Sequence, residues 1–193
     1  DGPAGVRLLT FVQSLVTDGL ATYVGDNAGG ADQLLKMADT NQPAAMALGS
    51  SAFLGTVLNT LGGGLVPGLG PADIGVGPLP GPVSPPSALV GGAALWITEG
   101  KDDVEAAAAW DFMQYLVQPE VQSLFAAATG YVPVRDDALE VEPAASLYRD
   151  DPRFRVAYDQ LVKTPDEPAL QGPILGPQRE IRNITANAVA EIF

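Results

Sequence analysis

The sequence predicts an α/β protein, because short apolar segments alternate with longer segments whose apolar residues recur at helical spacing. Hydrophobic residues make up 47% of the 193 residues, which is enough for most of the chain to fold around a core. The 22 glycines and 17 prolines cluster between the periodic segments, where they are typical of loops rather than of disorder.

Helices are predicted wherever apolar residues recur three and four positions apart. These segments are residues 3–18, 31–38, 52–61, 103–117, 119–129, about 152–162 and about 177–193. Ser50 or Ser51 is the expected N-cap of the third helix. Asp102, with Glu105 three residues later, has the spacing of a capping box. Gly130 is the expected stop of the helix that Pro119 opens.

Strands are predicted over the short apolar segments that lie between glycine-rich or proline-rich stretches. They cover residues 44–48, 74–79 and 94–98, and residues 131–134 are expected to be extended. Residues 62–71 are predicted to be a loop, 81–87 a stiff linker, and 136–152 irregular at first. Trp96 and Trp110 are assigned to the core.

Composition excludes several classes of function. The net charge is −13 with only 10 basic residues, which argues against binding to nucleic acid or to an anionic membrane surface. The chain has no cysteine and no histidine, so disulfides, zinc–thiolate sites and Ser-His-Asp catalysis are excluded. We therefore predict no cofactor and no metal.

One uncharged segment has to be weighed as a membrane span. Residues 40–72 carry no charge, but prolines and many glycines interrupt them, whereas a spanning helix needs about 20 continuous apolar residues. The sequence therefore argues against a span. No signal peptide precedes Asp1, and we expect any export signal to lie outside this sequence.

Residues 90–139 carry a combination of motifs that resembles the signature region of family 1 extracellular solute-binding proteins, the capture subunits of bacterial ABC importers. The matching features are Gly91-Gly92 before a strand with Trp96, Gly100-Lys101 before a helix with Trp110 and Phe112, Pro119-Glu120-Val121-Gln122, and Thr129-Gly130-Tyr131-Val132-Pro133-Val134. Residues 5–20, 44–53 and 172–184 are similar to other parts of the same family.

The resemblance implies a two-lobed fold of the periplasmic-binding-protein type II, of which this chain is the C-terminal half and lacks the first lobe. Residues 1–87 and 140–193 would then belong to the second lobe. Residues 88–139 would supply a hinge strand and helices that pack on the first lobe. Without that lobe, these helices are expected to expose an apolar face and to favour self-association.

The same resemblance implies the function. The protein would not be an enzyme but would capture a small hydroxylated ligand, such as a glycerophosphodiester, a polyol phosphate or a sugar. It would deliver this ligand to the membrane permease subunits of an ABC importer. Its location would be extracytoplasmic, in the periplasm or lipid-anchored on the outer face of the cell membrane.

Candidate ligand-binding residues lie at the ends of the predicted strands. Ser50 and Ser51 offer hydroxyls and free backbone N–H groups at a helix N-terminus, where they serve either as a cap or as a ligand site. Gly91 and Gly92 allow a ligand to approach the backbone, or make a tight turn into the next strand. Tyr131 offers a flat face and a polar tip, and is otherwise a buried structural residue.

The last predicted ligand loop contains Gly172 and leads to Gln178. The resemblance implies an arginine in this loop in glycerol-3-phosphate binders, but Ile174 stands at the matching position. This departure puts glycerol-3-phosphate itself in doubt. Gln178 or Arg179 could substitute, although Arg179 is expected on the helix surface.

Two other classes of function stay open. A glycoside hydrolase would need two facing carboxylates, and adjacent acidic pairs occur at Asp102-Asp103, Asp136-Asp137, Asp150-Asp151 and Asp166-Glu167. Adjacent acids on loops are usually solvated surface, which disfavours this class. A non-catalytic structural or adhesive surface domain is the other alternative.

Overall fold

The computed structural model describes residues 2–25, 31–81, 87–167, 170, 172 and 176–192. The chain divides into two compact units. Unit 1 consists of Asp1–Pro43 and Pro173–Phe193, and unit 2 consists of Ala44–Gly172. The ends of the chain therefore belong to the same unit, and unit 2 is the continuous segment between them.

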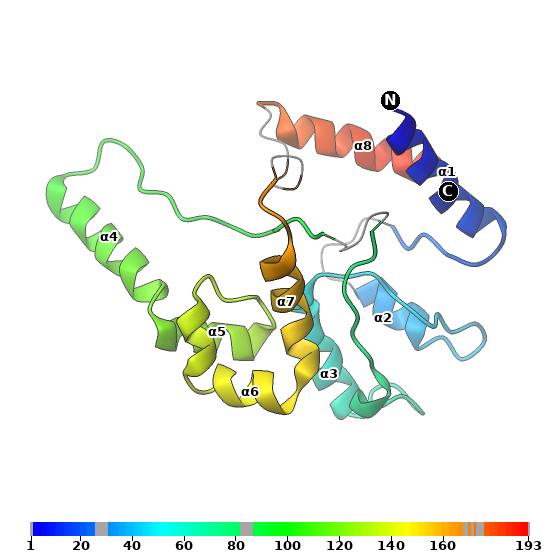
Figure 1. Ribbon diagram of the computed structural model, residues 1–193, viewed down its shortest axis with the longest axis horizontal. Helices are drawn as coiled ribbons and strands as arrows, with labels where there is room; N and C mark the ends of the chain where they lie inside the picture. The colour runs from blue at the N-terminus through cyan, green and yellow to red at the C-terminus, as the bar shows by residue number, and fades with distance from the viewer. Residues whose placement is uncertain are drawn as a thin grey trace. The chain divides into compact units, whose positions relative to one another are not determined.

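Unit 1 contains α1 (Pro3–Thr17), α2 (Ala31–Met37) and α8 (Gln178–Ile192), which Figure 1 draws in blue, light blue and red. Helix α1 ends as the sequence predicts. Gly19 has a positive φ of 70°, the Gly19 N–H donates to the Val16 carbonyl at 3.0 Å, and the Leu20 N–H donates to the Leu15 carbonyl at 2.8 Å. This pair of bonds is a Schellman motif, which satisfies the last carbonyls of the helix.

Unit 2 is helical throughout its described regular structure. Its elements in order are η1 (Ser51–Phe53), α3 (Leu54–Gly62), η2 (Pro71–Asp73), α4 (Asp103–Leu116), α5 (Pro119–Thr129), η3 (Asp136–Glu140), α6 (Ala144–Asp150), η4 (Pro152–Phe154) and α7 (Arg155–Lys163). Figure 1 shows α5, α6, α7 and α3 gathered together, while α4 extends away from them.

The core of unit 2 forms where α3, η3, α6 and α7 meet. Ala144, Tyr148 and Phe154 are its buried members, and the partly buried residues packed against them are Leu54, Leu58, Leu139, Leu147 and Tyr158. The α6 segment was expected to be irregular. Its apolar residues do recur at 144, 147 and 148, and they bury because α6 lies against α5 and η3.

The buried hydroxyl of Ser123 ties α5 to the start of α6. Ser123 Oγ donates to the Val141 carbonyl at 2.7 Å and accepts from the Ala144 N–H at 2.9 Å. Both Ser123 and Ala144 are fully buried. The hydroxyl thus satisfies the buried Ala144 N–H and the part-buried Val141 carbonyl.

Two side chains hold the irregular segment 70–81 against α7 and η4. Arg153 donates from Nη1 to the carbonyls of Pro71 at 2.6 Å and Ile74 at 3.1 Å. The amide of Gln160 accepts from the Leu79 N–H and donates to the Leu79 carbonyl, both at 2.9 Å. Gln160 therefore pairs with Leu79 as a neighbouring strand would.

The strands predicted at 44–48, 74–79 and 94–98 are not formed, and the described residues contain helices but no strand. A helix satisfies its hydrogen bonds within one segment, whereas a strand needs a second segment beside it. In the described part of the chain, the side chains of Arg153 and Gln160 bind the two ends of 74–79. The strand predictions are therefore wrong for this structure.

The apolar surface of α4 is exposed, as expected from the sequence. Val104 is 78% exposed and Phe112 is 58% exposed. Trp96 and Trp110 were assigned to the core, but they are 85% and 55% exposed, so that prediction was wrong. A helix that is apolar on most sides is normally covered on most sides.

Among the described residues, no helix combines the length and the apolar character that crossing a membrane requires.

Candidate functional site

The Ser50–Ser51 turn opens the helical segment that becomes α3. Ser50 has extended backbone angles, and its Oγ accepts from the Ala52 N–H at 3.3 Å, so Ser50 is the N-cap of η1. The Ser50 hydroxyl thus has a structural role that leaves it exposed. Ser51 is half-buried and makes no side-chain hydrogen bond within the described part of the chain. The free hydroxyl at this turn is therefore that of Ser51.

Tyr131 follows the C-terminus of α5 and lies against it. Gly130 caps the helix with a left-handed φ of 88°, and its N–H donates to the Ala126 carbonyl at 2.8 Å. The Tyr131 N–H donates to Thr129 Oγ1 at 3.1 Å, and the Tyr131 ring lies 5.4 Å from the Phe125 ring, centre to centre. Tyr131 is 45% exposed, so one part of the ring is packed and the rest is accessible.

The Ser51 turn and the end of α5 are in close contact. A Cβ atom placed on Gly130 would lie 2.8 Å from the Ser51 carbonyl oxygen and 3.5 Å from the Gly55 nitrogen. A Cβ atom placed on Gly55 would lie 3.3 Å from the Thr129 carbonyl oxygen. The absence of side chains at Gly55 and Gly130 thus lets the two backbones touch, and the structure brings two of the predicted segments together.

Gly91 and Gly92 lie in the exposed, irregular segment that precedes α4. A Cβ atom on either residue would meet no atom within 4 Å. The φ angle of neither residue is in the left-handed region. No described contact therefore brings them to Ser51 or Tyr131, and packing within the described residues does not require glycine at these two positions.

Gly172 lies beside the segment that leads to this glycine pair. Its φ is 83°, and a Cβ atom there would lie 4.0 Å from Leu89 Cδ2. Gly172 therefore lies near residue 89, two positions before Gly91. The Ile174 position discussed above lies outside the described residues.

Gln178 begins α8 in unit 1 and carries a buried Oε1 atom without a hydrogen-bond partner in the described residues. It lines a pocket of about 470 Å³ together with Arg179, Arg182, Asn183 and Ala186. A buried acceptor without a partner is uncommon in folded proteins. Arg182 and Asn183 were not singled out from the sequence, although Arg182 lies four residues after Gln178 and Asn183 lies four residues after Arg179, the spacing of helix-surface neighbours.

In three of the acidic pairs, at least one carboxylate has a structural partner among the described residues. Asp137 pairs with Arg135, whose guanidinium lowers the pKa of this carboxyl, and Asp151 pairs with Arg153, which likewise lowers the carboxyl pKa. A general acid in a glycosidase needs a raised pKa. Asp102 is occupied as the N-cap of α4, where Oδ1 accepts from the Glu105 N–H at 2.8 Å.

A family model described as bacterial extracellular solute-binding protein matches residues 1–155. The chain belongs to this family. Membership implies a periplasmic-binding-protein-like fold, and it agrees with the resemblance found in residues 90–139.

The curated relatives of this chain are named as binding proteins rather than as enzymes. The sn-glycerol-3-phosphate-binding periplasmic protein UgpB of Yersinia pestis bv. Antiqua (strain Antiqua) is 34% identical over 110 residues, which are 57% of this chain and 25% of that protein. UgpB of Pectobacterium atrosepticum is 30% identical over 110 residues, again 57% of this chain and 25% of the relative.

The similarity to UgpB of Salmonella typhimurium extends over a longer stretch at lower identity. It is 25% over 191 residues, which are 99% of this chain and 41% of that protein. The chain thus spans between a quarter and about two fifths of the length of the curated relatives it matches.

Proposed function

We propose that the intact protein containing this chain captures a small hydroxylated ligand that carries a phosphate group, either a glycerophosphodiester or a polyol phosphate. It would do so outside the cytoplasm and hand the ligand to the permease subunits of an ABC importer. Family membership and the names of the relatives support the class of ligand. A sugar without phosphate is the alternative within the same function.

The contact between the Ser51 turn and the end of α5 carries the assignment of the site. It places a free hydroxyl and a partly exposed tyrosine on two touching segments of unit 2. Ligand sites in proteins are commonly apolar or aromatic surfaces with a few convergent polar groups. In this proposal Ser51 and the Tyr131 hydroxyl bind ligand hydroxyls, and Ser50 keeps its role as a cap.

Within unit 1, the first turns of α8 offer groups that are suited to binding an anion. Arg179 and Arg182 lie three residues apart on one helix and have no ion-pair partner among the described residues. Guanidinium groups bind phosphate oxygens in pairs of parallel hydrogen bonds. The buried Oε1 of Gln178 lines the same pocket and has no hydrogen-bond partner among the described residues.

The lobe assignment completes the proposal. Residues 1–87 and 140–193 would belong to the second lobe of an α/β protein. The segments that the sequence predicts as strands would then pair with other strands in the intact protein. Residues 88–139 would pack on a first lobe, which would supply the other half of the cleft. Gly91, Gly92 and Gly172 would then face that cleft.

Calorimetry on the full-length protein tests this proposal. The ligands are glycerol-3-phosphate, glycerophosphocholine, glycerol and a panel of sugars. Replacing Ser51 with Ala, or Tyr131 with Phe, is expected to weaken binding by about 1–3 kcal/mol each, because a buried ligand group loses its partner. Ser14→Ala is the matched control, since the Ser14 hydroxyl bonds only to the Phe11 carbonyl of its own helix.

The ligand panel separates the two ligand classes. Phosphate-bearing ligands are expected to bind more tightly than glycerol and the sugars, and the double variant Arg179→Gln, Arg182→Gln is expected to remove that preference. Unchanged affinity in both the Ser51 and the Tyr131 variants would show that the ligand lies elsewhere. If a sugar binds tightly and phosphate-bearing ligands bind no better, the transported ligand is a sugar without phosphate.

A further inference from the structure

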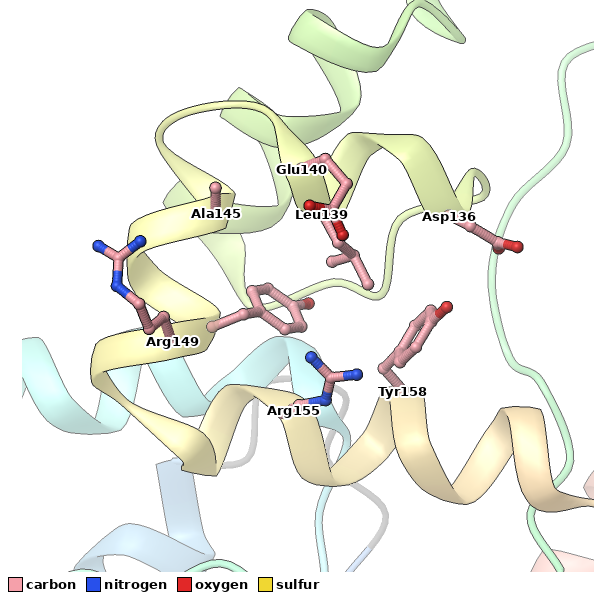
Figure 2. Close-up of a pocket in the computed structure, with 8 residues that line it drawn as sticks. Asp136, Leu139, Glu140, Ala145, Arg149, Arg155 and Tyr158 are labelled. Carbon is pink, nitrogen blue, oxygen red and sulfur yellow. The ribbon is translucent and has the colours of Figure 1, made fainter.

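A second pocket lies in unit 2 on the side formed by η3, α6 and α7, and Figure 2 shows it in close-up. Its volume is about 440 Å³, which is enough for a small molecule. Its polar lining consists of Asp136 and Glu140 from η3, Tyr148 and Arg149 from α6, and Arg155 and Tyr158 from α7. None of these residues belongs to the Ser51–Tyr131 surface.

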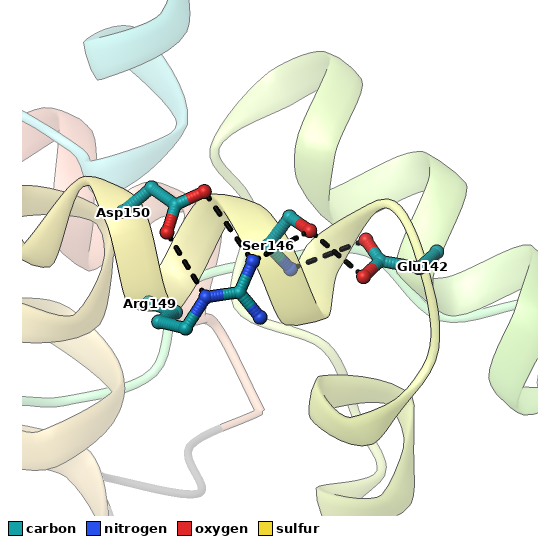
Figure 3. Close-up of polar contacts among 4 residues, drawn as sticks. All are labelled: Glu142, Ser146, Arg149 and Asp150. Carbon is teal, nitrogen blue, oxygen red and sulfur yellow. Dashed lines mark hydrogen bonds and ion pairs between the residues drawn. The ribbon is translucent and has the colours of Figure 1, made fainter.

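One of the two arginines is already occupied by its neighbours. Arg149 Nε donates to Asp150 Oδ1 at 3.0 Å, and Nη2 donates to Ser146 Oγ at 2.9 Å. The Ser146 hydroxyl donates in turn to Glu142 Oε1 at 2.7 Å, and Figure 3 shows this chain of contacts along α6. Arg149 is therefore part of a surface network at the rim rather than a free cation.

The other arginine keeps most of its donors free. Arg155 Nε donates to Asp159 Oδ1 at 3.0 Å, and the guanidinium lies 5.9 Å from the centre of the Tyr158 ring. These two contacts fix its position. Its terminal nitrogens have no partner in the described part of the chain. In Figure 2 the guanidinium points from α7 into the space beneath η3.

Tyr148 adds a phenol whose hydroxyl has no hydrogen-bond partner among the described residues. The residue as a whole is only 5% exposed and lines the pocket, but its oxygen is not one of the buried unpartnered atoms, so the hydroxyl is accessible from the pocket. Burial raises the pKa of the Tyr148 phenol, so the group stays protonated and able to donate. The pocket thus offers a guanidinium and a phenol as unused donors.

Unused charges of the opposite sign lie on the other wall. The carboxylates of Asp136 and Glu140 line the pocket from η3 and have no partner among the described residues. A simple anion would be repelled by these two carboxylates, and a simple cation would be repelled by Arg155. A molecule that carries both charges would satisfy both walls.

We propose that this pocket is a second ligand site, separate from the Ser51–Tyr131 surface, and that it binds a small zwitterion. The oxyanion of the ligand meets Arg155 and Tyr148, and its ammonium group meets Glu140 and Asp136. The shared chemistry is an ammonium group and an oxyanion on one small molecule, whether the oxyanion is a phosphate or a carboxylate.

Binding measurements on the full-length protein test this site with phosphoethanolamine and β-alanine as probes. At least one zwitterion is expected to bind saturably, and roughly tenfold or more tightly than either inorganic phosphate or ethylammonium alone. The stronger of the two probes identifies the oxyanion. The proposal is overturned if neither zwitterion binds, or if phosphate alone binds as tightly.

Matched variants locate the bound probe. Tyr148→Phe removes only an unpartnered hydroxyl, so the fold should persist while zwitterion affinity falls roughly tenfold. Arg155→Gln and Glu140→Gln should each weaken binding further, and Lys101→Gln, which removes an exposed charge elsewhere, should leave it unchanged. Full affinity in Tyr148→Phe and Glu140→Gln would refute the site.

A crossed comparison separates this site from the proposed transport ligand site. Ser51→Ala should leave zwitterion binding at the second pocket unchanged, and Tyr148→Phe should leave binding of the transported ligand unchanged. If Ser51→Ala instead abolishes zwitterion binding, the probe occupies the Ser51–Tyr131 surface and the second site is refuted, while the proposed function stands.

Discussion

Gly130 and the carbonyl oxygen of Ser51 are in direct contact, and a Cβ atom at Gly130 would lie only 2.8 Å from that oxygen. Real Cβ atoms essentially never approach a backbone oxygen so closely. Gly130 also has a φ of 88°, which disfavours any side chain. Two independent constraints thus require glycine at the end of α5, and one of them acts through the Ser51 turn.

Replacing Gly130 with Ala is expected to cost more than the backbone angle alone explains. Gly100 is the matched control, since its φ is 84° and a Cβ atom there meets nothing within 4 Å. Gly100→Ala should lower the free energy of unfolding by about 1–2 kcal/mol. Gly130→Ala should lower it by a further 1–3 kcal/mol or so, because the Ser51 backbone must move. Urea unfolding of both variants measures the difference.

The same displacement should weaken ligand binding if Ser51 belongs to the site. Gly130→Ala is then expected to reduce ligand affinity, whereas Gly100→Ala should not. Equal stability of the two variants would show that the Ser51 turn adapts without cost.

Ser123→Ala is expected to be strongly destabilising for so small a change. The substitution leaves the Val141 carbonyl and the Ala144 N–H without the partner that Ser123 Oγ supplies. The expected loss is about 2–3 kcal/mol in the free energy of unfolding, because the Ala144 N–H is buried and the Val141 carbonyl is part-buried. Thermal or urea unfolding measures it.

Ser146→Ala is the control for this effect. Ser146 makes exposed contacts to Glu142 and Arg149, so its loss should change stability by no more than about 0.5 kcal/mol. Similar small effects of both substitutions would mean that water replaces the Ser123 hydroxyl.

The helices of this chain can be predicted from its sequence because the residues that start, cap and end them lie close together in the chain. The Asp102 cap, the Pro119 start and the Gly130 stop all lie where the sequence predicts them. Helix α6 was missed because the acidic residues around it suggested a solvated loop. The apolar spacing of Ala144, Leu147 and Tyr148 was the signal that could have found it.

The strands could not be predicted with the same success, because strand formation depends on partners far along the chain or outside it. Residues 74–79 carry the apolar pattern of a strand, yet Arg153 binds the carbonyl of Ile74 at the start of this stretch, and the amide of Gln160 binds the backbone of Leu79 at its end. Likewise, the contact of Gly130 with Ser51 joins segments about 80 residues apart, and no local pattern encodes it.

Arg153 is expected to make stability depend on pH through Asp151. Hydrogen bonding to Arg153 lowers the pKa of the Asp151 carboxyl below its ordinary value of 3.8. A lowered folded-state pKa means that the stabilisation is complete above the unfolded-state pKa and is lost as pH falls through the folded-state value. Stability should therefore decrease on acidification from about pH 5 downward.

Arg153→Met should flatten this acid dependence, because the Asp151 pKa returns toward 3.8 without its partner. It should also destabilise the protein at neutral pH, since the Pro71 and Ile74 carbonyls lose their donor. Arg135→Met is a control for the loss of the loop contacts, because the Arg135–Asp137 pair contacts no distant loop. Urea midpoints measured across this pH range test both statements, and parallel curves for wild type and Arg153→Met would contradict them.

The exposed apolar face of α4 is expected to make the 193-residue chain self-associate when it is produced alone. Phe112 and Tyr115 are 58% and 53% exposed and lie three residues apart, near the exposed Val104 on the same helix face. Contiguous apolar surface of this kind favours association. Replacing Phe112 and Tyr115 with Ser should shift sedimentation profiles toward the monomer. Val162→Ser, which changes an equally exposed side chain on α7, should not. A wild-type chain that remains monomeric at high concentration would show that α4 needs no cover.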